Sequence, residues 1–592
     1  MKNHKSYKLK VLSLFLVFVL ILSACGSNPS VSEVSSKPDE SVSQISSENE
    51  NETNSDTVKE ETVITDILNL LDEAPEGLCT VNTPEKIIIT SREADVSGDL
   101  ALSTLQGLAS KHSKTQFIIK NGDGFDFMVS KINEKWNIET LDNINGNTPD
   151  LKNLAKFYFD EGITTQYILC KSEKESDSWY VAASLSGIMN AVAVPECLED
   201  IFKDIGYTCC FDARELDDGW LKKCEYFSLI NKDIALEQMA EYAPHLIDLA
   251  VKNGAYVGFS NSDNKQLHTY KYDFLNDNAL VFGYNNKLGE LNTVETLSKL
   301  SACLVPSDWA CNLSVLSNLN LEKLEQGDTV FDSEDYKAPE NVHTVCLLMS
   351  DGDNMQWFLN DFTKEGGKWY GSDVRGQFPM GWGVPAVSID MCAPMLQYVY
   401  DEKTENDEFI MELSGLGYTF PSRWKEEALA EMTEDLASYM ERSDLEYVEI
   451  LDNNGFNNDT KLSYFTDKDA IEGIFYIDYV DYTLNKGEIK FLNGKPVVAA
   501  KHTIWNNFFG HNEGNVEVVA EKINGYSTDI KSEEAYTFII VHCWSGFDES
   551  GNLVANGDTM KGLEKFASLL DEDVELVTPG EFMERIEENL GE

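Results

Sequence analysis

Acidic residues follow several apolar runs in the second half of the chain. Asp351 and Asp353 come directly after Thr344–Ser350, on one side of an extended segment, and Glu412 lies within the apolar run Phe409–Leu413. A carboxylate in so apolar a segment is costly to bury unless it faces a polar interior. Paired carboxyl groups can cleave a glycosidic bond, because one protonates the leaving oxygen while the other attacks the sugar or activates water.

Another candidate acid follows the run Tyr447–Leu451. Glu449 and Asp452 lie three positions apart and therefore on opposite faces of a strand, so only one of them is expected to face a ligand. We expect that one to be Asp452, because it lies where the run ends. The predicted catalytic residues are Asp351, Asp353, Glu412 and Asp452.

Aromatic rings accompany these acids in the run Gly-Leu-Gly-Tyr-Thr-Phe-Pro at 415–421. Its two glycines can adopt positive φ and let a ligand approach the backbone, and its proline fixes the end of the turn. The rings of this run and of Trp424 offer flat faces to the C–H surfaces of a pyranose. The predicted substrate-binding residues are Trp357, Gly415, Gly417, Tyr418, Phe420, Pro421, Trp424, Asp478, His502, His542 and Trp544.

The same run resembles the motif after which the GxGYxYP family is named, with Phe420 where the family usually has its second Tyr. The substitution removes a hydroxyl and keeps the ring. Short segments at 105–108 and 306–314 are similar to the region that precedes the motif domain in that family, and the resemblance covers most of residues 80–592. It implies a glycoside hydrolase with a carbohydrate or polysaccharide substrate.

Two other functions remain open from the residues alone. A metal-dependent deacetylase acting on amino sugars would use Asp351, Asp353 and His542 as metal ligands or base, and the segment 577–582 is similar to the last strand of polysaccharide deacetylases. No His-x-x-x-His or His-Glu-x-x-His spacing supports that alternative, so no metal and no cofactor are predicted. A lipoprotein that captures carbohydrate without turnover is the third hypothesis.

Strand-like and helix-like segments alternate from residue 336 to 592, which predicts a (β/α) barrel-like catalytic domain. An open, doubly wound sheet would produce the same alternation. The preceding residues 63–335 are expected to form two or three small α/β domains, with helices over 100–111 and 179–194. The expected strands are 86–90, 117–120, 167–170 and 208–211 in the first part, and 344–350, 384–389, 409–413, 447–451, 473–477, 497–501, 537–541 and 574–577 in the second.

The first 25 residues have the pattern of a bacterial lipoprotein signal peptide. Four lysines precede an apolar run at 11–22 that is short for a membrane-spanning helix, and Leu-Ser-Ala-Cys closes the pattern at Cys25. We expect cleavage before Cys25, lipid on its sulfur and a flexible tether over 26–62, which is rich in Ser, Glu, Asn and Asp. The mature protein would then lie on the outer, extracytoplasmic face of the bacterial cytoplasmic membrane.

The chain is strongly acidic, with 47 Lys and Arg against 102 Asp and Glu and a formal net charge of −55. Nucleic acid is therefore not an expected partner, because binding to phosphates needs a basic patch. Without Cys25, 11 of the 12 cysteines remain, an odd number without any Cys-x-x-Cys pair, and no disulfide is predicted.

Overall fold

The computed structural model describes residues 67–591, apart from positions 94, 123, 330–338, 506–513, 549, 553, 555 and 556. The predicted signal peptide, Cys25, the tether and the expected boundary near residue 336 lie outside the described residues. Within the described part of the chain, no helix is both long enough and apolar enough to cross a membrane.

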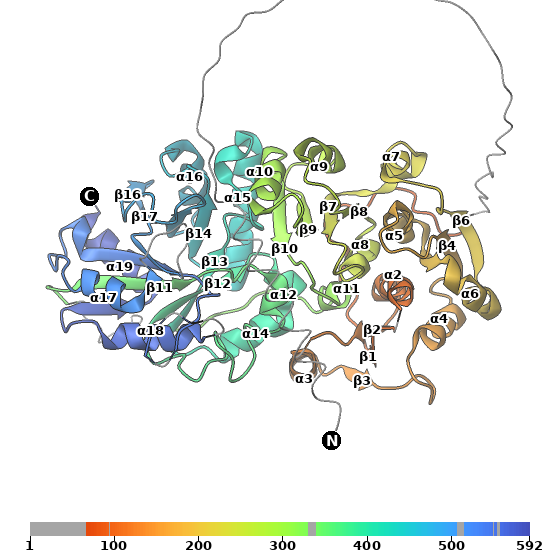
Figure 1. Ribbon diagram of the computed structural model, residues 1–592, viewed down its shortest axis with the longest axis horizontal. Helices are drawn as coiled ribbons and strands as arrows, with labels where there is room; N and C mark the ends of the chain where they lie inside the picture. Colours follow the sequence, from red (N-terminus) through yellow and green to blue (C-terminus); the bar gives the residue numbers. More distant parts are fainter. Residues whose placement is uncertain are drawn as a thin grey trace, which may run out of the picture. The chain divides into compact units, whose positions relative to one another are not determined.

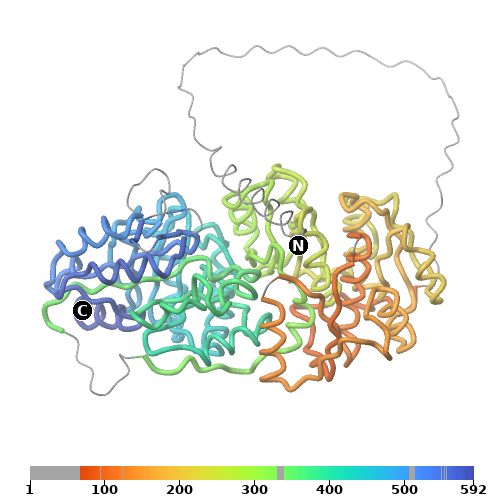
Figure 2. Tube along the Cα trace, turned by 60° about the horizontal axis from the view of Figure 1, so that its bottom comes forward, coloured from red at the N-terminus to blue at the C-terminus, as the bar shows by residue number. Residues whose placement is uncertain are grey.

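Three small parallel sheets precede the second half of the chain (Figures 1 and 2). Their strand orders are β2-β1-β3, β5-β4-β6 and β10-β9-β7-β8. The strands are β1 (Lys86–Thr90), β2 (Thr115–Ile119), β3 (Glu139–Leu141), β4 (Gln166–Cys170), β5 (Ala191–Pro195), β6 (Thr208–Asp212), β7 (Asn231–Gln238), β8 (Ala255–Phe259), β9 (Leu280–Gly283) and β10 (Cys303–Pro306). The helices are α2 (Val96–His112), α3 (Phe125–Trp136), α4 (Leu151–Asp160), α5 (Asp177–Met189), α6 (Glu199–Ile205), α7 (Asp218–Leu221), α8 (Ile247–Asn253), α9 (Lys265–Tyr272), α10 (Glu290–Lys299) and α11 (Leu313–Leu316).

A larger sheet follows, with the order β16-β17-β15-β14-β13-β12-β11-β19-β18 and with β20 also paired to β11. Helices lie around it (Figure 1). Its strands are β11 (His343–Met349), β12 (Met380–Pro385), β13 (Asp407–Glu412), β14 (Tyr447–Asp452), β15 (Gly473–Asp478), β16 (Ile489–Leu492), β17 (Lys495–Ala499), β18 (His502–Ile504), β19 (Tyr536–Val541) and β20 (Val574–Val577). Its helices are α12 (Met355–Phe358), α13 (Ser388–Met391), α14 (Ala393–Asp401), α15 (Glu426–Ser443), α16 (Asp459–Thr466), α17 (Val516–Ile523), α18 (Thr559–Ser568) and α19 (Pro579–Leu590).

The segment 495–504 curls this sheet back toward its own beginning. Its first part, β17, pairs with β15, and its last part, β18, pairs with β19. Between them the Ala500 N–H donates to the Tyr476 carbonyl at 2.9 Å, and the Lys501 N–H donates to the Phe538 carbonyl at 2.9 Å. One bent segment therefore joins the two ends of the strand series, and the predicted α/β fold with a barrel-like second half is confirmed.

Helix α19 covers the end of the sheet where the strands begin. The Phe582 ring contacts the rings of Phe475 and Tyr536, with centroids 6.1 and 6.2 Å apart. The Gly580 N–H donates to Glu408 near the start of β13, and Arg585 donates to Thr344 near the start of β11. Because this end is filled, the opposite end, where the strands finish, is the one that can receive a ligand.

Two expected elements differ from the structure. The strand expected at 384–389 lies earlier, at β12, and residues 388–391 are helical. The helix expected at 179–194 ends at Met189, because Asn190 adopts a left-handed conformation with φ of 49°, and the next five residues form β5. Helix α5 and strand β5 are buried almost throughout, so hydrophobic periodicity does not separate them.

Candidate active site

Asp351 lies at the carboxyl end of β11, in the turn that follows the strand. Its φ is 67°, a left-handed conformation that is uncommon outside glycine and is concentrated at functional sites. Its Oδ2 accepts hydrogen bonds from the Ser350 hydroxyl and, at 3.3 Å, from the Cys543 thiol. The side chain remains 30% exposed. The carboxylate is thus held by one oxygen and accessible to solvent.

Glu412, the last residue of β13, lies under the same turn. Its Oε1 accepts the Asp351 N–H at 2.9 Å and its Oε2 accepts the Gly352 N–H at 2.8 Å. The neighbouring strand makes room for it at Gly383, where a Cβ would lie 1.6 Å from Glu412 Oε2. Burial raises the pKa of Glu412 well above its usual range, and Glu449 contributes in the same direction.

Two further buried carboxyl groups belong to this cluster. Neither oxygen of Glu449 and only one oxygen of Asp353 has a hydrogen-bond partner among the described residues. Burial raises the pKa of each of these carboxyl groups well above its usual range, and the charge of Asp351 adds to the effect in both. We call Asp351, Asp353, Glu412 and Glu449 the acidic cluster. Asp351 and Asp353 lie in the turn after β11, Glu412 ends β13 and Glu449 lies within β14.

Glu449, rather than Asp452, is the residue of β14 in this cluster. Asp452 accepts the Ser422 N–H at 2.9 Å, the Ser422 hydroxyl at 2.8 Å and the Asn453 N–H at 2.7 Å. It therefore ties the loop after the motif to the end of β14. The feature that pointed to Glu412 in the sequence, a carboxylate within an apolar strand, could also have identified Glu449.

Several rings on the Asp351 side of the cluster follow β11 and β19. His542 Nε2 lies 4.0 Å from Asp351 Oδ2, and its ring stacks on that of Trp505 with centroids 3.7 Å apart. Burial lowers the pKa of His542 to about 4. Trp544 is 52% exposed, and its ring packs against those of Trp357 and Trp369 at 5.1 and 5.4 Å. The structure thus places an exposed indole two residues from the histidine beside Asp351.

The motif at 415–421 packs against the sheet β10-β9-β7-β8, which together with its helices we call the third small domain. The Leu304 N–H donates to the Tyr418 carbonyl at 3.0 Å and the Tyr418 N–H donates to the Leu304 carbonyl at 2.6 Å. A Cβ on Gly417 would lie 2.5 Å from the Leu304 carbonyl oxygen. Neither Gly415 nor Gly417 has the positive φ that was expected, so at Gly417 it is the missing side chain that matters.

The other predicted residues of this loop are buried. Phe420, Pro421 and Trp424 belong to the core and expose no ring face for stacking on a sugar.

Two further predicted residues lie outside this loop. Asp478 accepts the N–H groups of Asn454 and Val480 and orders the loops around it. His502 pairs with the Tyr526 hydroxyl at 2.8 Å.

Groups that sequence reasoning missed reach the cluster from the third small domain. The Tyr418 hydroxyl donates to Glu290 Oε1 at 2.9 Å. The charge of Glu290 acts on Asp353, and the charge of Asp351 acts on Glu290. Asp308, which follows β10, also acts on both. Nothing in the local sequence marks Glu290, because its role depends on how two domains pack.

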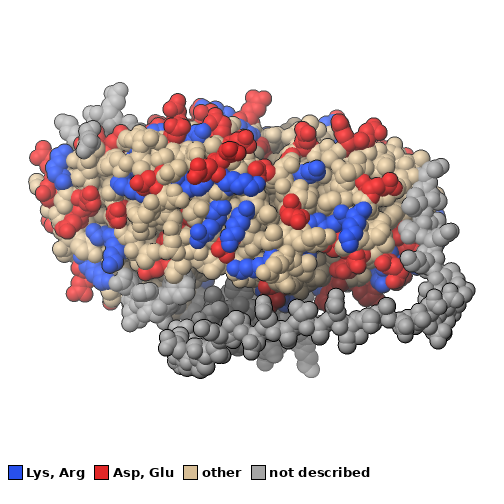
Figure 3. Space-filling view, turned by 90° about the horizontal axis from the view of Figure 1, so that it is seen from above, with Lys and Arg blue, Asp and Glu red and all other residues tan. Residues whose placement is uncertain are grey.

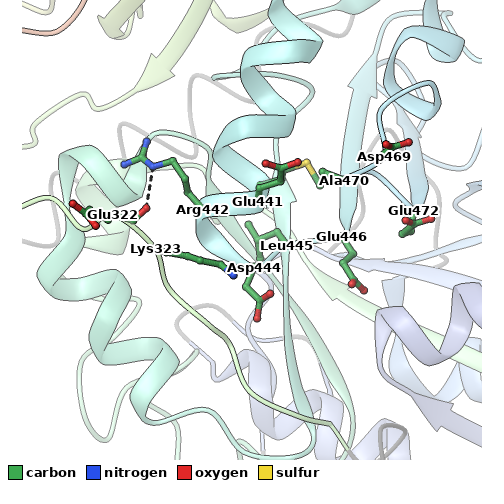
Figure 4. A pocket seen from close by; sticks show the side chains of 11 residues that line it. Glu322, Lys323, Glu441, Arg442, Asp444, Leu445, Glu446, Asp469, Ala470 and Glu472 are labelled. Carbon is green, nitrogen blue, oxygen red and sulfur yellow. Dashed lines mark hydrogen bonds between the residues drawn. The ribbon is translucent and has the colours of Figure 1, made fainter.

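One cavity of the described part of the chain lies elsewhere. It measures about 540 Å³ and is lined by residues that precede β14 and β15, among them Glu446 and Glu472 (Figure 4). Arg442 on its wall donates to the Glu322 carbonyl at 3.4 Å. None of the predicted site residues lines it. In barrels of this type chemistry occurs where the strands end, so we place the site at the acidic cluster rather than at this cavity.

Within the described residues, no group of three or more His, Cys, Asp or Glu side chains has an arrangement that could hold a metal ion. The eleven cysteines of the described part form no disulfide with one another.

Comparisons with known proteins identify two regions of the chain. Residues 341–587 match the family model described as "GxGYxYP putative glycoside hydrolase C-terminal domain", and residues 232–318 match "GxGYxYP third domain". A comparison with curated proteins found no match.

Two solved structures are similar to the chain. A crystal structure described as "a putative hydrolase", from Bacteroides thetaiotaomicron VPI-5482, is 27% identical with a TM-score of 0.77 and covers 88% of this chain and 100% of that chain. A peptidoglycan deacetylase from Bacillus subtilis is 12% identical with a TM-score of 0.23 over 42% of this chain and 95% of that chain, a likeness too small to carry an argument. The two matched domains, with the motif at 415–421 inside the C-terminal one, show that the chain belongs to the GxGYxYP family.

Proposed function

We propose that the protein is a carbohydrate hydrolase that cleaves glycosidic bonds at the acidic cluster, where Asp351 acts together with a protonated carboxyl group beside it. The observation that carries the proposal is the contrast between Asp351, which is accessible, and its buried neighbours Asp353, Glu412 and Glu449, whose pKa values are raised. Burial keeps carboxyl groups at this site protonated to a higher pH than usual, which supplies the acid that the reaction needs.

In this mechanism Asp351, the accessible member of the cluster, is the nucleophile or the base. Its carboxylate either attacks the anomeric carbon or removes a proton from the attacking water, while a protonated carboxyl group gives its proton to the leaving oxygen. Trp544, exposed and packed on Trp357, supplies a ring face on which a pyranose can stack. The family match and the hydrolase-like structural neighbour support the reaction class.

The experiment is a digestion screen. The purified protein is incubated with a panel of oligosaccharides and polysaccharides, and released reducing ends are measured. We expect cleavage of at least one substrate, and we expect Asp351→Asn to lose activity by about a hundredfold or more. The matched control is Asp361→Asn, which changes an exposed aspartate ten residues further along and should leave the rate unchanged. Full activity of Asp351→Asn would refute the assignment.

Anchoring to the membrane is part of the proposal. A lipid on Cys25 and the acidic tether would hold the enzyme at the outer face of the cytoplasmic membrane, within reach of extracellular glycans. The test compares the full-length protein with Cys25→Ala expressed in a bacterium. The former should enter the detergent phase and take up labelled fatty acid, and the variant should do neither. Equal behaviour of the two proteins would contradict the anchor.

A further inference from the structure

The third small domain presents its strand ends to the barrel-like domain. Tyr284 follows β9, Glu290 begins α10 and Asp308 follows β10, so all three lie at the carboxyl end of one parallel sheet. Parallel sheets bind their ligands at that edge. The Tyr418 hydroxyl donates to Glu290 Oε1 at 2.9 Å and Leu304 of β10 pairs with Tyr418, so this edge of the sheet lies against the loop that follows Glu412. The electrostatic influence of Asp351 on Glu290, and of Glu290 on Asp353, agrees with this placement. The carboxyl ends of two sheets therefore meet at one place.

The contacts that hold Glu290 there come from the motif. One contact is the hydrogen bond from the Tyr418 hydroxyl to Glu290. The Ser298 hydroxyl, on the same helix as Glu290, forms a hydrogen bond with the Thr419 hydroxyl at 2.9 Å. The Phe420 N–H donates to the Ser298 hydroxyl at 2.9 Å. Helix α10 is thus fixed to three consecutive residues of the motif.

Glu290 has a carboxyl group with a raised pKa and is also accessible to solvent. Burial raises its pKa to about 7, and the charges of Asp351 and Asp308 act in the same direction, while the Tyr418 hydrogen bond opposes them. The residue is nevertheless only partly buried. An acid whose pKa lies near the working pH is well suited to give a proton in a transition state and to recover it afterwards.

We propose that Glu290 is the catalytic proton donor of this hydrolase and that Tyr418 of the motif is the residue that positions it. The inference rests on the proposed function. Glu290 gives its proton to the glycosidic oxygen as the bond from that oxygen to the anomeric carbon breaks, and the bonding electrons leave with the oxygen. Water supplies the hydroxyl that takes its place on the sugar, and its other proton returns to the Glu290 carboxylate, directly or through Asp351.

This assignment gives the motif a role other than sugar stacking. The small Gly417 lets the loop pair with Leu304 of β10, and the Tyr418 hydroxyl then reaches the carboxyl group that begins α10. The motif would hold an acid of one domain over the acids of another. A buried phenol whose hydroxyl donates to that carboxyl group fits this task.

The test compares substrates that need protonation of the leaving group with substrates that do not. Methyl and dinitrophenyl glycosides of the sugar cleaved in the digestion screen are offered to the wild type, Glu290→Gln and Tyr418→Phe. Glu290→Gln should lower kcat/KM for the methyl glycoside by about 10²- to 10⁴-fold and for the dinitrophenyl glycoside by less than about tenfold. It should also abolish the loss of rate on the alkaline side of the pH profile.

Tyr418→Phe should give a smaller loss and move that alkaline limb to higher pH, because the phenol hydrogen bond favours the ionised carboxylate. The matched control is Glu295→Gln on the same helix, which removes surface ion pairs with Lys265 and Lys299 and should leave both rates unchanged. Thermal unfolding of each variant checks that it is folded.

The possible outcomes separate the two proposals. If the wild type cleaves the glycosides but Glu290→Gln slows both substrates equally, or neither, the assignment of Glu290 fails and the proposed function stands. If a misfolded Glu290→Gln prevents the comparison, an unchanged alkaline limb in Tyr418→Phe overturns the assignment. If the wild type cleaves no glycoside in the panel, the proposed function fails and this inference fails with it.

Discussion

At the scale of single residues, Glu412 acts through the backbone of its neighbours. Each of its oxygens accepts one N–H from the turn that carries Asp351, so an amide at this position would set an NH₂ group against an N–H. Glu412→Gln should therefore cost about 1–3 kcal/mol of stability and displace Asp351, lowering turnover while carbohydrate binding is retained. Unfolding curves, kcat and ligand titration measure the three effects.

The control for that variant lies on the same strand. Glu408 is buried at the opposite end of β13 and accepts the Gly580 N–H at 2.8 Å. Glu408→Gln should lose stability without losing turnover per folded molecule. If the two variants lose turnover equally, the role of Glu412 is no more than support of the strand.

Glu408 should also make the stability of the protein depend on pH. Burial raises its pKa from 4.5 to about 7, so the folded state holds this proton more tightly than the unfolded state does. Its contribution to stability is complete below about pH 4.5 and is lost as the pH rises through about 7. The free energy of unfolding of the wild type, taken relative to that of Glu408→Gln, should be larger at about pH 5 than at about pH 8, by roughly 2 kcal/mol. A difference in stability that does not change with pH would contradict this.

At the scale of elements, the motif loop depends on the absence of one side chain. Gly417→Ala brings a Cβ to 2.5 Å from the Leu304 carbonyl, a backbone atom that cannot turn aside, so we expect a loss of about 1–3 kcal/mol. At Gly415 the corresponding neighbour is the flexible Met432 Sδ at 3.0 Å, so Gly415→Ala should cost less. Thermal unfolding ranks the two variants, and the reverse order would show that the domain contact is not what constrains the motif.

The same scale explains why β12 was misplaced from the sequence. Its Met-Gly-Trp-Gly-Val-Pro segment contains two glycines and ends in proline, which is unlike a typical strand. Gly383 is required because the Glu412 carboxylate occupies the space of its side chain. The strand signal is therefore weakest where the strand accommodates the site.

At the scale of the whole molecule, the formal charge of −55 opposes compact folding. Acidic and basic side chains are interspersed on the face shown in Figure 3, where local pairs offset part of the repulsion. Added sodium chloride should screen the excess negative charge and raise Tm by a few degrees, since exposed charges are screened over short distances at high salt. An unchanged or lower Tm would show that the ion pairs, which salt weakens, outweigh the net repulsion.

The sequence alone determined the alternation of strands and helices, the barrel-like second half, the family and the candidate acids Asp351, Asp353 and Glu412. These features are local: an apolar run, a carboxylate within or after it, and a motif of fixed spacing. Most strand positions in the second half follow from such runs.

Only the tertiary structure decided that Glu449 joins the acidic cluster, that Asp452 ties the motif loop to β14, and that Phe420 and Trp424 are core residues. Only it brought Glu290 to Tyr418, across 128 positions of sequence. The physical reason is that burial and the proximity of charges are set by packing between elements, and these two quantities decide which carboxyl group holds a proton.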